Sequence, residues 1–517
     1  MGEAEKFADL KAELANVLEP ATINAEKCSW DFYINSTQDN MQKYEESQDE
    51  YSKIFQDKKM YEKFLRIDSS KLSKHDAKQL KDILKEYDEE LNTGDALKAL
   101  RKRENEIAAK INSYIPKIDG KEVSKTELTK ILQTDDNAEL RKKAYNARIA
   151  GGDLIAEDLI DFVKMRNEYA KTKGFENYFD YKLKESYDVD SVFLDKILAE
   201  VYSKAEVKIK EVQSKKIQEL KEHFGTDVLE GYHYGLLLDS NPEKEVNKIL
   251  ENQDVETLSK KIYSKMGYDI DKMVECGKLT LDLYPRKGKN THGFCFGVEA
   301  GKDSRILANL TNNVISLDTL NHELGHCVYD LGISTKLQFF DKAPSSSAFT
   351  EAIAMMTGDI IKTEDVLSDI IPDDVFQKFK QSHIEDEASF VAKSLLIIDF
   401  ERELYKNPEI NPAQLWQKLR KKYLMRNDKA DNEWATIPHY LSHPAYYQNY
   451  FRAAIMKAQV YSYLKSVLGN LTENNRSAKF MDENIFSVGA SVEEYDLIRQ
   501  LTGKDFSVDD FVSSIQG

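Results

Sequence analysis

Apolar residues recur every three or four positions along much of the chain, which is the period of an amphipathic helix. The clearest stripe lies between residues 193 and 212 and comprises Phe193, Leu194, Ile197, Leu198, Val201, Ala205 and Val212. The stretch from about 78 to 111 has the same period on either side of Gly94, with dense charge on its other face. Only residues 278–310 have strand character, because Leu279–Tyr284 alternates and Arg305–Leu310 is short and apolar. The pattern predicts a mainly helical fold with one small sheet.

One helical segment carries the spacing of a metal site. His322 and His326 flank Glu323 in the run His-Glu-Leu-Gly-His, and two histidines four residues apart project from the same helix face. In such sites both imidazoles bind one zinc ion, and the glutamate between them takes a proton from the attacking water. The alternative is two ordinary surface histidines beside a solvated glutamate. Ser316 or Asp318 could cap this helix, and Gly332 could end it.

A catalytic zinc needs a third protein ligand, and the sequence offers Glu351. The pattern with Gly and His three and six residues beyond the second histidine is excluded, because Tyr329 and Gly332 hold those positions. Glu351 is a lone carboxylate on the apolar segment 349–358, which is costly to bury unless a cation pairs with it. Ser345, Ser346 and Ser347 offer caps for this second helix. The alternative is a surface glutamate stabilised by the helix dipole.

These residues resemble the angiotensin-converting-enzyme family of zinc peptidyl-dipeptidases. The zinc segment 322–326 and the segment Phe349-Thr350-Glu351-Ala352-Ile353 carry the likeness, and it extends to Trp30–Thr37, Leu415-Trp416 and Leu501-Thr502-Gly503. Residues 282–289 are similar to the thimet oligopeptidase and oligopeptidase F family. The resemblance implies a two-lobed helical zinc metallopeptidase with a deep central channel and a small sheet beside the active-site helix. No internal boundary is visible, so we expect residues 1–517 to form one peptidase unit of two interwoven lobes.

The resemblance also implies roles for residues outside the zinc segment. It makes Tyr450 and His439 the donors that stabilise the oxyanion, with His443 as the alternative histidine, and it places Tyr447 at the far end of the substrate. The remaining substrate contacts implied are His292 and Gly293, and residues 305–309 as an exposed strand edge that pairs with the peptide.

Three positions depart from that family's pattern. Ile437 stands where the family has the lysine that binds the substrate's terminal carboxylate, and Asn449 stands where it has the arginine of chloride activation. Strict release of C-terminal dipeptides and chloride dependence are therefore not expected. Met355 replaces an acidic residue that supports the zinc site, a role for which Asp359 or Asp330 is available.

Charge and composition exclude other classes of protein. The net charge of −17 argues against binding to nucleic acid, which needs concentrated basic surface. The sequence contains no run of eighteen apolar residues that would predict a membrane span, and residues 1–20 lack the apolar core of a signal peptide. Four cysteines without a pattern indicate reduced thiols, and Cys327 is interpreted as packing. We therefore expect a cytoplasmic protein, unless a leader has been removed.

The sequence as a whole predicts a zinc-dependent peptidase that hydrolyses short peptides by water attack assisted by Glu323. One alternative within this class is an oligopeptidase that cuts short peptides internally rather than releasing C-terminal dipeptides. An alternative of another class is a peptide-binding protein that keeps the fold without catalysis. The oligomeric state cannot be predicted, although a monomer is plausible.

Overall fold

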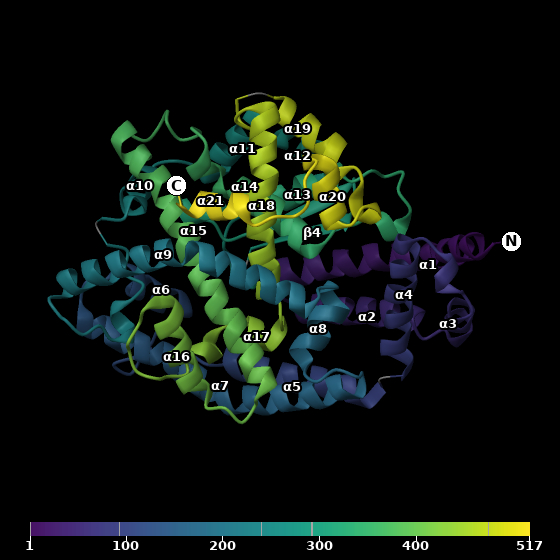
Figure 1. The fold of residues 1–517 in the computed structure, drawn as a ribbon, viewed down its shortest axis with the longest axis horizontal. Helices are drawn as coiled ribbons and strands as arrows, with labels where there is room; N and C mark the ends of the chain where they lie inside the picture. Colours follow the sequence, from purple (N-terminus) through teal and green to yellow (C-terminus); the bar gives the residue numbers. More distant parts are fainter. Residues whose placement is uncertain (1, 93, 239, 291–292, 474, 517) are drawn as a thin grey trace. The chain divides into compact units, whose positions relative to one another are not determined.

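The computed structural model describes residues 2–92, 94–238, 240–290, 293–473 and 475–516. Figure 1 shows a chain built mostly from helices, as the sequence predicts. The chain divides into two compact units, each assembled from three stretches. The first unit contains Met1–Gly94, Val246–Asp373 and Ala453–Ser507, and the second contains Asp95–Glu245, Asp374–Arg452 and Val508–Gly517.

The first unit holds the larger of the two sheets and the predicted zinc helix. Its elements are α1 (Glu3–Ile34), α2 (Gln38–Ile54), α3 (Lys58–Leu65), η1 (Ser69–Lys71), α4 (Lys74–Asn92), α11 (Val255–Met266), α12 (Ile270–Glu275), β3 (Leu279–Asp282), β4 (Phe294–Glu299), β5 (Asp303–Leu307), α13 (Val314–Gly332), η3 (Phe339–Asp341), α14 (Ser347–Thr363), α19 (Arg476–Met481), η5 (Asp482–Phe486), η6 (Gly489–Ser491) and α20 (Glu494–Thr502).

The second unit is formed by helices, several of them long, and by one hairpin whose two strands have two residues each. Its elements are α5 (Gly94–Asn112), β1 (Lys117–Ile118), β2 (Lys121–Glu122), α6 (Lys125–Thr134), α7 (Ala138–Thr172), α8 (Tyr178–Tyr187), α9 (Ser191–Phe224), η2 (Gly231–His233), α15 (Asp373–Lys406), α16 (Pro412–Leu424), η4 (Glu433–Thr436), α17 (His439–Ser442) and α21 (Asp509–Gln516). Two of the unit boundaries fall inside α10 (Pro242–Leu250) and α18 (Tyr447–Leu468), and two more follow the first residues of α5 and α15.

The predicted stripe on α9 forms part of the core of the second unit. All of its members except Phe193 are buried, which confirms the prediction of a long amphipathic helix with one core face. Within the described residues, no helix combines the length and apolarity needed to cross a bilayer.

The three-stranded sheet has the order β3-β5-β4, so β5 is its central strand. β3 pairs with β5 in parallel, and β4 pairs with β5 antiparallel, with Phe294 opposite Leu307. The expectation that residues 305–309 form an exposed edge is therefore wrong, because strands flank β5 on both sides. β4 is an edge strand instead, and the rings of Trp30 and Tyr33 on α1 pack against Phe296 and Phe294.

Helix α13 begins earlier than the sequence indicated. Its N-cap is Asn313, whose side chain accepts a hydrogen bond from the backbone N–H of Ser316, so neither Ser316 nor Asp318 is the cap. The helix ends at Gly332 as expected. Its apolar stripe is buried and comprises Leu317, Leu320, Leu324 and Val328. Among the three serines offered as caps for α14, Ser346 takes that position and accepts from the N–H of Phe349.

Helices α13 and α14 approach closely where glycines replace side chains. A Cβ atom on Gly325 would lie 2.2 Å from Thr357 Oγ1 and 2.9 Å from the Cα atom of Ala354. A Cβ atom on Gly358 would lie 2.9 Å from Asp318 Oδ1. Because the backbone of Ala354 cannot move aside as a side chain can, the two helices can keep this spacing only with glycine at position 325, whereas the atom near Gly358 is the end of the Asp318 side chain.

Replacing Gly325 with alanine tests this close approach. We expect Gly325→Ala to lower the free energy of unfolding by about 1–3 kcal/mol, because the new methyl group forces α13 and α14 apart. Urea denaturation followed by circular dichroism measures the change. Gly2→Ala is the control, since a Cβ there has no heavy atom within 4 Å. Equal stability of the Gly325→Ala variant and the wild type would contradict the packing described.

Candidate active site

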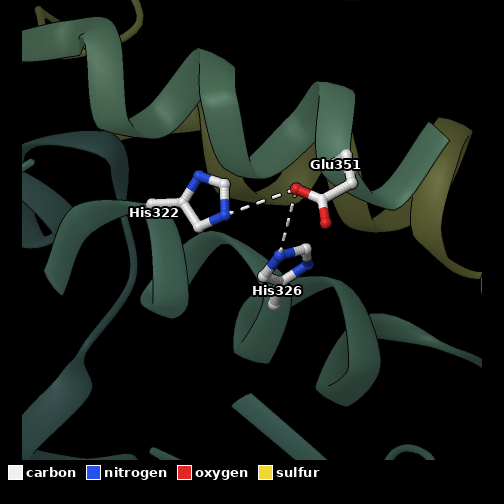
Figure 2. Close-up of side chains that lie close together, drawn as sticks. All are labelled: His322, His326 and Glu351. Atoms are coloured by element: carbon white, nitrogen blue, oxygen red, sulfur yellow. Dashed lines mark ion pairs between the residues drawn. The ribbon is translucent and has the colours of Figure 1, made fainter. Parts of the chain in front are cut away.

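His322, His326 and Glu351 come together where α13 faces α14. Figure 2 shows the two imidazoles on α13 pointing toward the carboxylate on α14. His322 Nε2 lies 3.5 Å from Glu351 Oε2, and His326 Nε2 lies 3.8 Å from the same oxygen. One ligand atom from each of the three residues lies within 4.8 Å of the other two. The structure thus joins the three residues that the spacing and the apolar context of Glu351 singled out.

The geometry of these donors fits a small tetrahedral cation. Zinc bonds of about 2.1 Å at tetrahedral angles place ligand atoms about 3.4 Å apart, close to the two separations observed. Two imidazoles and one carboxylate are also a donor set that catalytic zinc sites use, with a fourth position left for water. Glu351 is only 8% exposed, and a buried carboxylate of this kind requires positive charge beside it.

Two residues support the histidines in ways the sequence did not suggest. His326 Nδ1 forms a 2.9 Å hydrogen bond with Thr350 Oγ1, which turns Nε2 toward Glu351. Asp318 lies one helical turn before His322, and its negative charge favours the protonated form of that histidine. Asp318 lies at i−4 from His322 on the same helix, so helical spacing is the signal that could have found it, whereas the contact of Thr350 joins two helices.

The two carboxylates expected to replace the family's acidic residue have other partners. Lys457 Nζ lies 2.5 Å from Asp359 Oδ2, and Ser304 Oγ lies 3.4 Å from Asp330 Oδ2. Asp318 is the better candidate for that role, because it lies one turn before His322 and its charge favours the protonated form of that histidine.

Glu323 is a buried carboxyl group that follows His322 on α13. It is 8% exposed, and the backbone N–H of Cys295 on β4 donates to its carboxylate. Burial is the main cause that raises its pKa from 4.5 to about 7; His322 opposes the shift and Glu351 adds to it. A carboxyl group with this pKa can both accept and release a proton near neutral pH.

The two histidines differ in pKa although they share a carboxylate. Burial lowers the pKa of His322, but the hydrogen bond that its imidazole donates to Glu351 and the charge of Glu323 outweigh this effect and bring the pKa to about 9. For His326, burial and then the charge of His322 lower the pKa to about 4. In the metal-free protein one histidine thus carries a proton beside Glu351, at the position a cation would take, and the other offers a lone pair.

Gly293 lies close to the proposed base. A Cβ atom built there would be 3.8 Å from Glu323 Oε1 and 3.4 Å from the side chain of Thr319. The lack of a side chain at Gly293 therefore keeps the space over Glu323 open. His292, the other substrate residue predicted here, lies outside the described residues.

The four predicted residues of the 439–450 segment form a cluster of their own in the second unit. The ring of His439 lies 4.8 Å from that of Tyr447, and 6.0 Å from the rings of both Tyr450 and His443. Two buried charged side chains hold the backbone of this segment. Arg166 donates to the carbonyl oxygens of Tyr440 and Leu441, and Glu401 accepts from the N–H of Ala445.

Comparison with known proteins identifies the family. The sequence model of Peptidase family M3 matches residues 131–517, and the model described as angiotensin-converting enzyme matches residues 2–232. Because the first match covers well over half of the chain, the chain belongs to Peptidase family M3. The expected relation to both families is confirmed, as is the mainly helical fold with a small sheet beside α13.

Two bacterial relatives match parts of the chain. An oligoendopeptidase F homolog of Borreliella burgdorferi is 24% identical over 367 residues, which cover 67% of this chain and 59% of the relative. Oligopeptidase PepF of Bacillus subtilis is 25% identical over 232 residues, covering 43% of this chain and 33% of the relative. The chain thus spans less than two thirds of the length of either relative.

The raised pKa of Glu323 predicts a pH-dependent stability. The ionised carboxylate is disfavoured in the folded, metal-free protein, so a penalty develops as the pH rises from 4.5 to about 7 and then stays constant. Glu323→Gln removes this penalty, and we expect the metal-free variant to be more stable than wild type by up to about 3 kcal/mol above pH 7, with no gain below pH 4.5.

Urea denaturation of the metal-free proteins across this pH range measures the difference. Glu45→Gln, on the exposed face of α2, is the matched control and should show no pH-dependent gain. A stability gain for Glu323→Gln that is independent of pH would show that the carboxyl does not titrate as described.

Proposed function

We propose that this protein is a zinc-dependent peptidase acting on short peptides. The observation that carries the proposal is the convergence of His322, His326 and Glu351 at ligand distances, with Glu323 buried directly beside them. Membership of Peptidase family M3 supports the same class of activity. The proposal assigns His322 Nε2, His326 Nε2 and a Glu351 oxygen as the zinc ligands.

Zinc in such a site supplies a Lewis acid that lowers the pKa of a water molecule and polarises the substrate carbonyl. The chain supplies the proton transfers. Glu323 takes a proton from the attacking water and delivers it to the leaving amine, a role suited to a buried carboxyl group beside the metal ligands. The N–H of Cys295 holds the carboxylate in place during this exchange.

An extended peptide could pair with the free edge of β4. Main-chain pairing holds a substrate without demanding particular side chains, and β4 carries the Cys295 N–H that contacts Glu323. Gly293, just before β4, gives room for the reacting carbonyl. This assignment moves the substrate edge from residues 305–309 to β4.

The roles of the 439–450 segment rest on the family resemblance. Tyr450 and His439 are proposed as hydrogen-bond donors to the oxyanion, with His443 as the alternative histidine and Tyr447 as a substrate contact. The anchoring of this segment by Arg166 and Glu401 supports a positioning function.

The proposed cytoplasmic location agrees with four free cysteines, and for the oligomeric state we keep the expectation of a monomer.

The cleavage mode favoured by the comparisons is internal cutting of short peptides. Both relatives carry oligopeptidase names, and Ile437 stands where a dipeptide-releasing enzyme has a lysine for the terminal carboxylate. Release of C-terminal dipeptides is the second candidate, supported by the match to angiotensin-converting enzyme over residues 2–232. A peptide-binding protein without catalysis is disfavoured by the intact base and ligand set.

Removing the base tests the mechanism. We expect Glu323→Gln to bind zinc as the wild type does but to lose turnover by about 10²–10⁴-fold, because the amide cannot accept a proton. Zinc content by elemental mass spectrometry and hydrolysis of a quenched fluorescent peptide measure the two properties. Glu45→Gln should retain both. Near-normal rates in a zinc-loaded Glu323→Gln variant would reject Glu323 as the base.

The cleavage mode is tested with peptides of increasing length, each supplied with a free and an amidated C-terminus. We expect internal cuts that are indifferent to amidation, because Ile437 stands where a dipeptide-releasing enzyme has the lysine for the terminal carboxylate. Mass spectrometry of the products distinguishes the modes. Stepwise loss of dipeptides from free C-termini alone would establish the protein as a peptidyl-dipeptidase. Absence of cleavage by the zinc-loaded protein would favour the peptide-binding alternative.

A further inference from the structure

Two of the four cysteines meet directly behind the candidate active site. Cys295 Sγ on β4 lies 3.1 Å from Cys327 Sγ on α13, although 32 residues separate them in the chain. Cys327 is completely buried, whereas Cys295 is only half-buried. The other two cysteines have different surroundings, since Cys28 Sγ contacts Asn24 and Cys276 Sγ contacts the carbonyl oxygen of Met273.

Polar groups surround the thiol pair. Ser304 Oγ on β5 lies 3.1 Å from Cys327 Sγ and 3.4 Å from Cys295 Sγ. The thiol of Cys295 donates to Asp330 Oδ2 at 3.8 Å, so a proton acceptor is at hand. Asp330 packs closely on β4, because a Cβ atom on Gly297 would lie 2.6 Å from the same oxygen. A thiol that only fills space needs no such set of polar partners.

We propose that Cys295 and Cys327 form an oxidative modification site, a dithiol that closes to a disulfide and ties β4 to α13. The sulfur atoms must approach by about 1 Å to reach bonding distance, a movement within the range of side-chain rotation and small strand shifts. The oxidant is hydrogen peroxide, which reaches Cys295 first because this residue is partly exposed whereas Cys327 is buried.

The reaction is balanced in two steps. In the first step, Cys295 loses its proton to Asp330 and attacks one peroxide oxygen; the O–O bond breaks, a sulfenic acid forms, and the departing hydroxide takes the proton back from Asp330 to become water. In the second step, the sulfur of Cys327 attacks the sulfenic sulfur; the S–O bond breaks, the S–S bond forms, and the departing oxygen leaves as water. Two thiols are oxidised by two electrons, and the peroxide is reduced to two molecules of water.

The environment makes this reaction slow and selective. The hydrogen bond with Cys327, burial and the nearby charge of Asp330 raise the pKa of the Cys295 thiol, so little thiolate is present near neutral pH. The partner sulfur already lies in contact with Cys295, so the second step should be faster than further oxidation of the sulfenic acid by peroxide.

The crosslink is expected to affect catalysis because each of its two cysteines is connected to a residue of the candidate site. The backbone N–H of Cys295 holds the Glu323 carboxylate, and Cys327 directly follows His326. A shift of about 1 Å at catalytic groups can cost up to about a hundredfold in rate. We therefore expect oxidation to lower peptide hydrolysis by about tenfold or more. This consequence rests on the proposed function, whereas the crosslink itself does not.

The test treats the full-length, zinc-loaded protein with hydrogen peroxide, blocks the remaining thiols with iodoacetamide after denaturation, and maps peptides without reduction. The expected product is lighter than the reduced protein by the mass of two hydrogen atoms. It contains one disulfide, which joins the peptide of Cys295 to the peptide of Cys327. Dithiothreitol should restore both the mass and the rate of hydrolysis.

Single substitutions identify the thiols that are required. Cys295→Ser and Cys327→Ser should each abolish the crosslink, and Cys28→Ser and Cys276→Ser are matched controls that should keep it. A crosslink that involves Cys28 or Cys276, or sulfinic acid at Cys295 without a crosslink, would overturn the proposal. Unmodified thiols under conditions that oxidise exposed Cys276 would overturn it as well. Peptide mapping gives these answers even if the protein proves to have no peptidase activity.

Discussion

The close contact between α13 and α14 is the constraint on which the candidate site depends. Gly325 and Gly358 allow the two helices to approach so closely that the carboxylate of Glu351 faces both histidines. The approach places two buried carboxylates, Glu323 and Glu351, near each other. Such an arrangement is stable only with a positive charge at its centre, and in the metal-free protein the proton on His322 supplies it.

The sheet and the helix act together on Glu323. β4 lies at an edge of the sheet and extends one N–H group to the Glu323 carboxylate, and burial brings the pKa of that carboxyl near neutrality. The other side of the same contact between β4 and α13 contains Cys295, Cys327, Ser304 and Asp330. Cys295 on β4 therefore contacts both the proposed base, through its backbone N–H, and the second thiol, through its side chain. We expect a change at the thiols to affect Glu323 through this residue.

The sequence contained the core of the site because local spacing determines it. Residues four apart on a helix must share a face, and a lone carboxylate in an apolar helix must find a partner, so His322, His326 and Glu351 could be predicted together. The cap of α13 was missed because the helix begins at Val314, before both of the cap candidates, Ser316 and Asp318. The strand order could not be predicted, since neither strand length nor alternation says which strand lies in the middle. Thr350 and Cys295 were missed because their contacts with the site depend on tertiary packing between different elements.

The central claim is that His322, His326 and Glu351 hold one zinc ion. A crystal structure of the zinc-loaded protein, with anomalous diffraction recorded on both sides of the zinc absorption edge, tests it most directly. We expect one strong anomalous peak at about 2.0–2.2 Å from His322 Nε2, His326 Nε2 and a carboxylate oxygen of Glu351. Zinc bound elsewhere, or no peak between α13 and α14 in a protein saturated with zinc, would contradict the account.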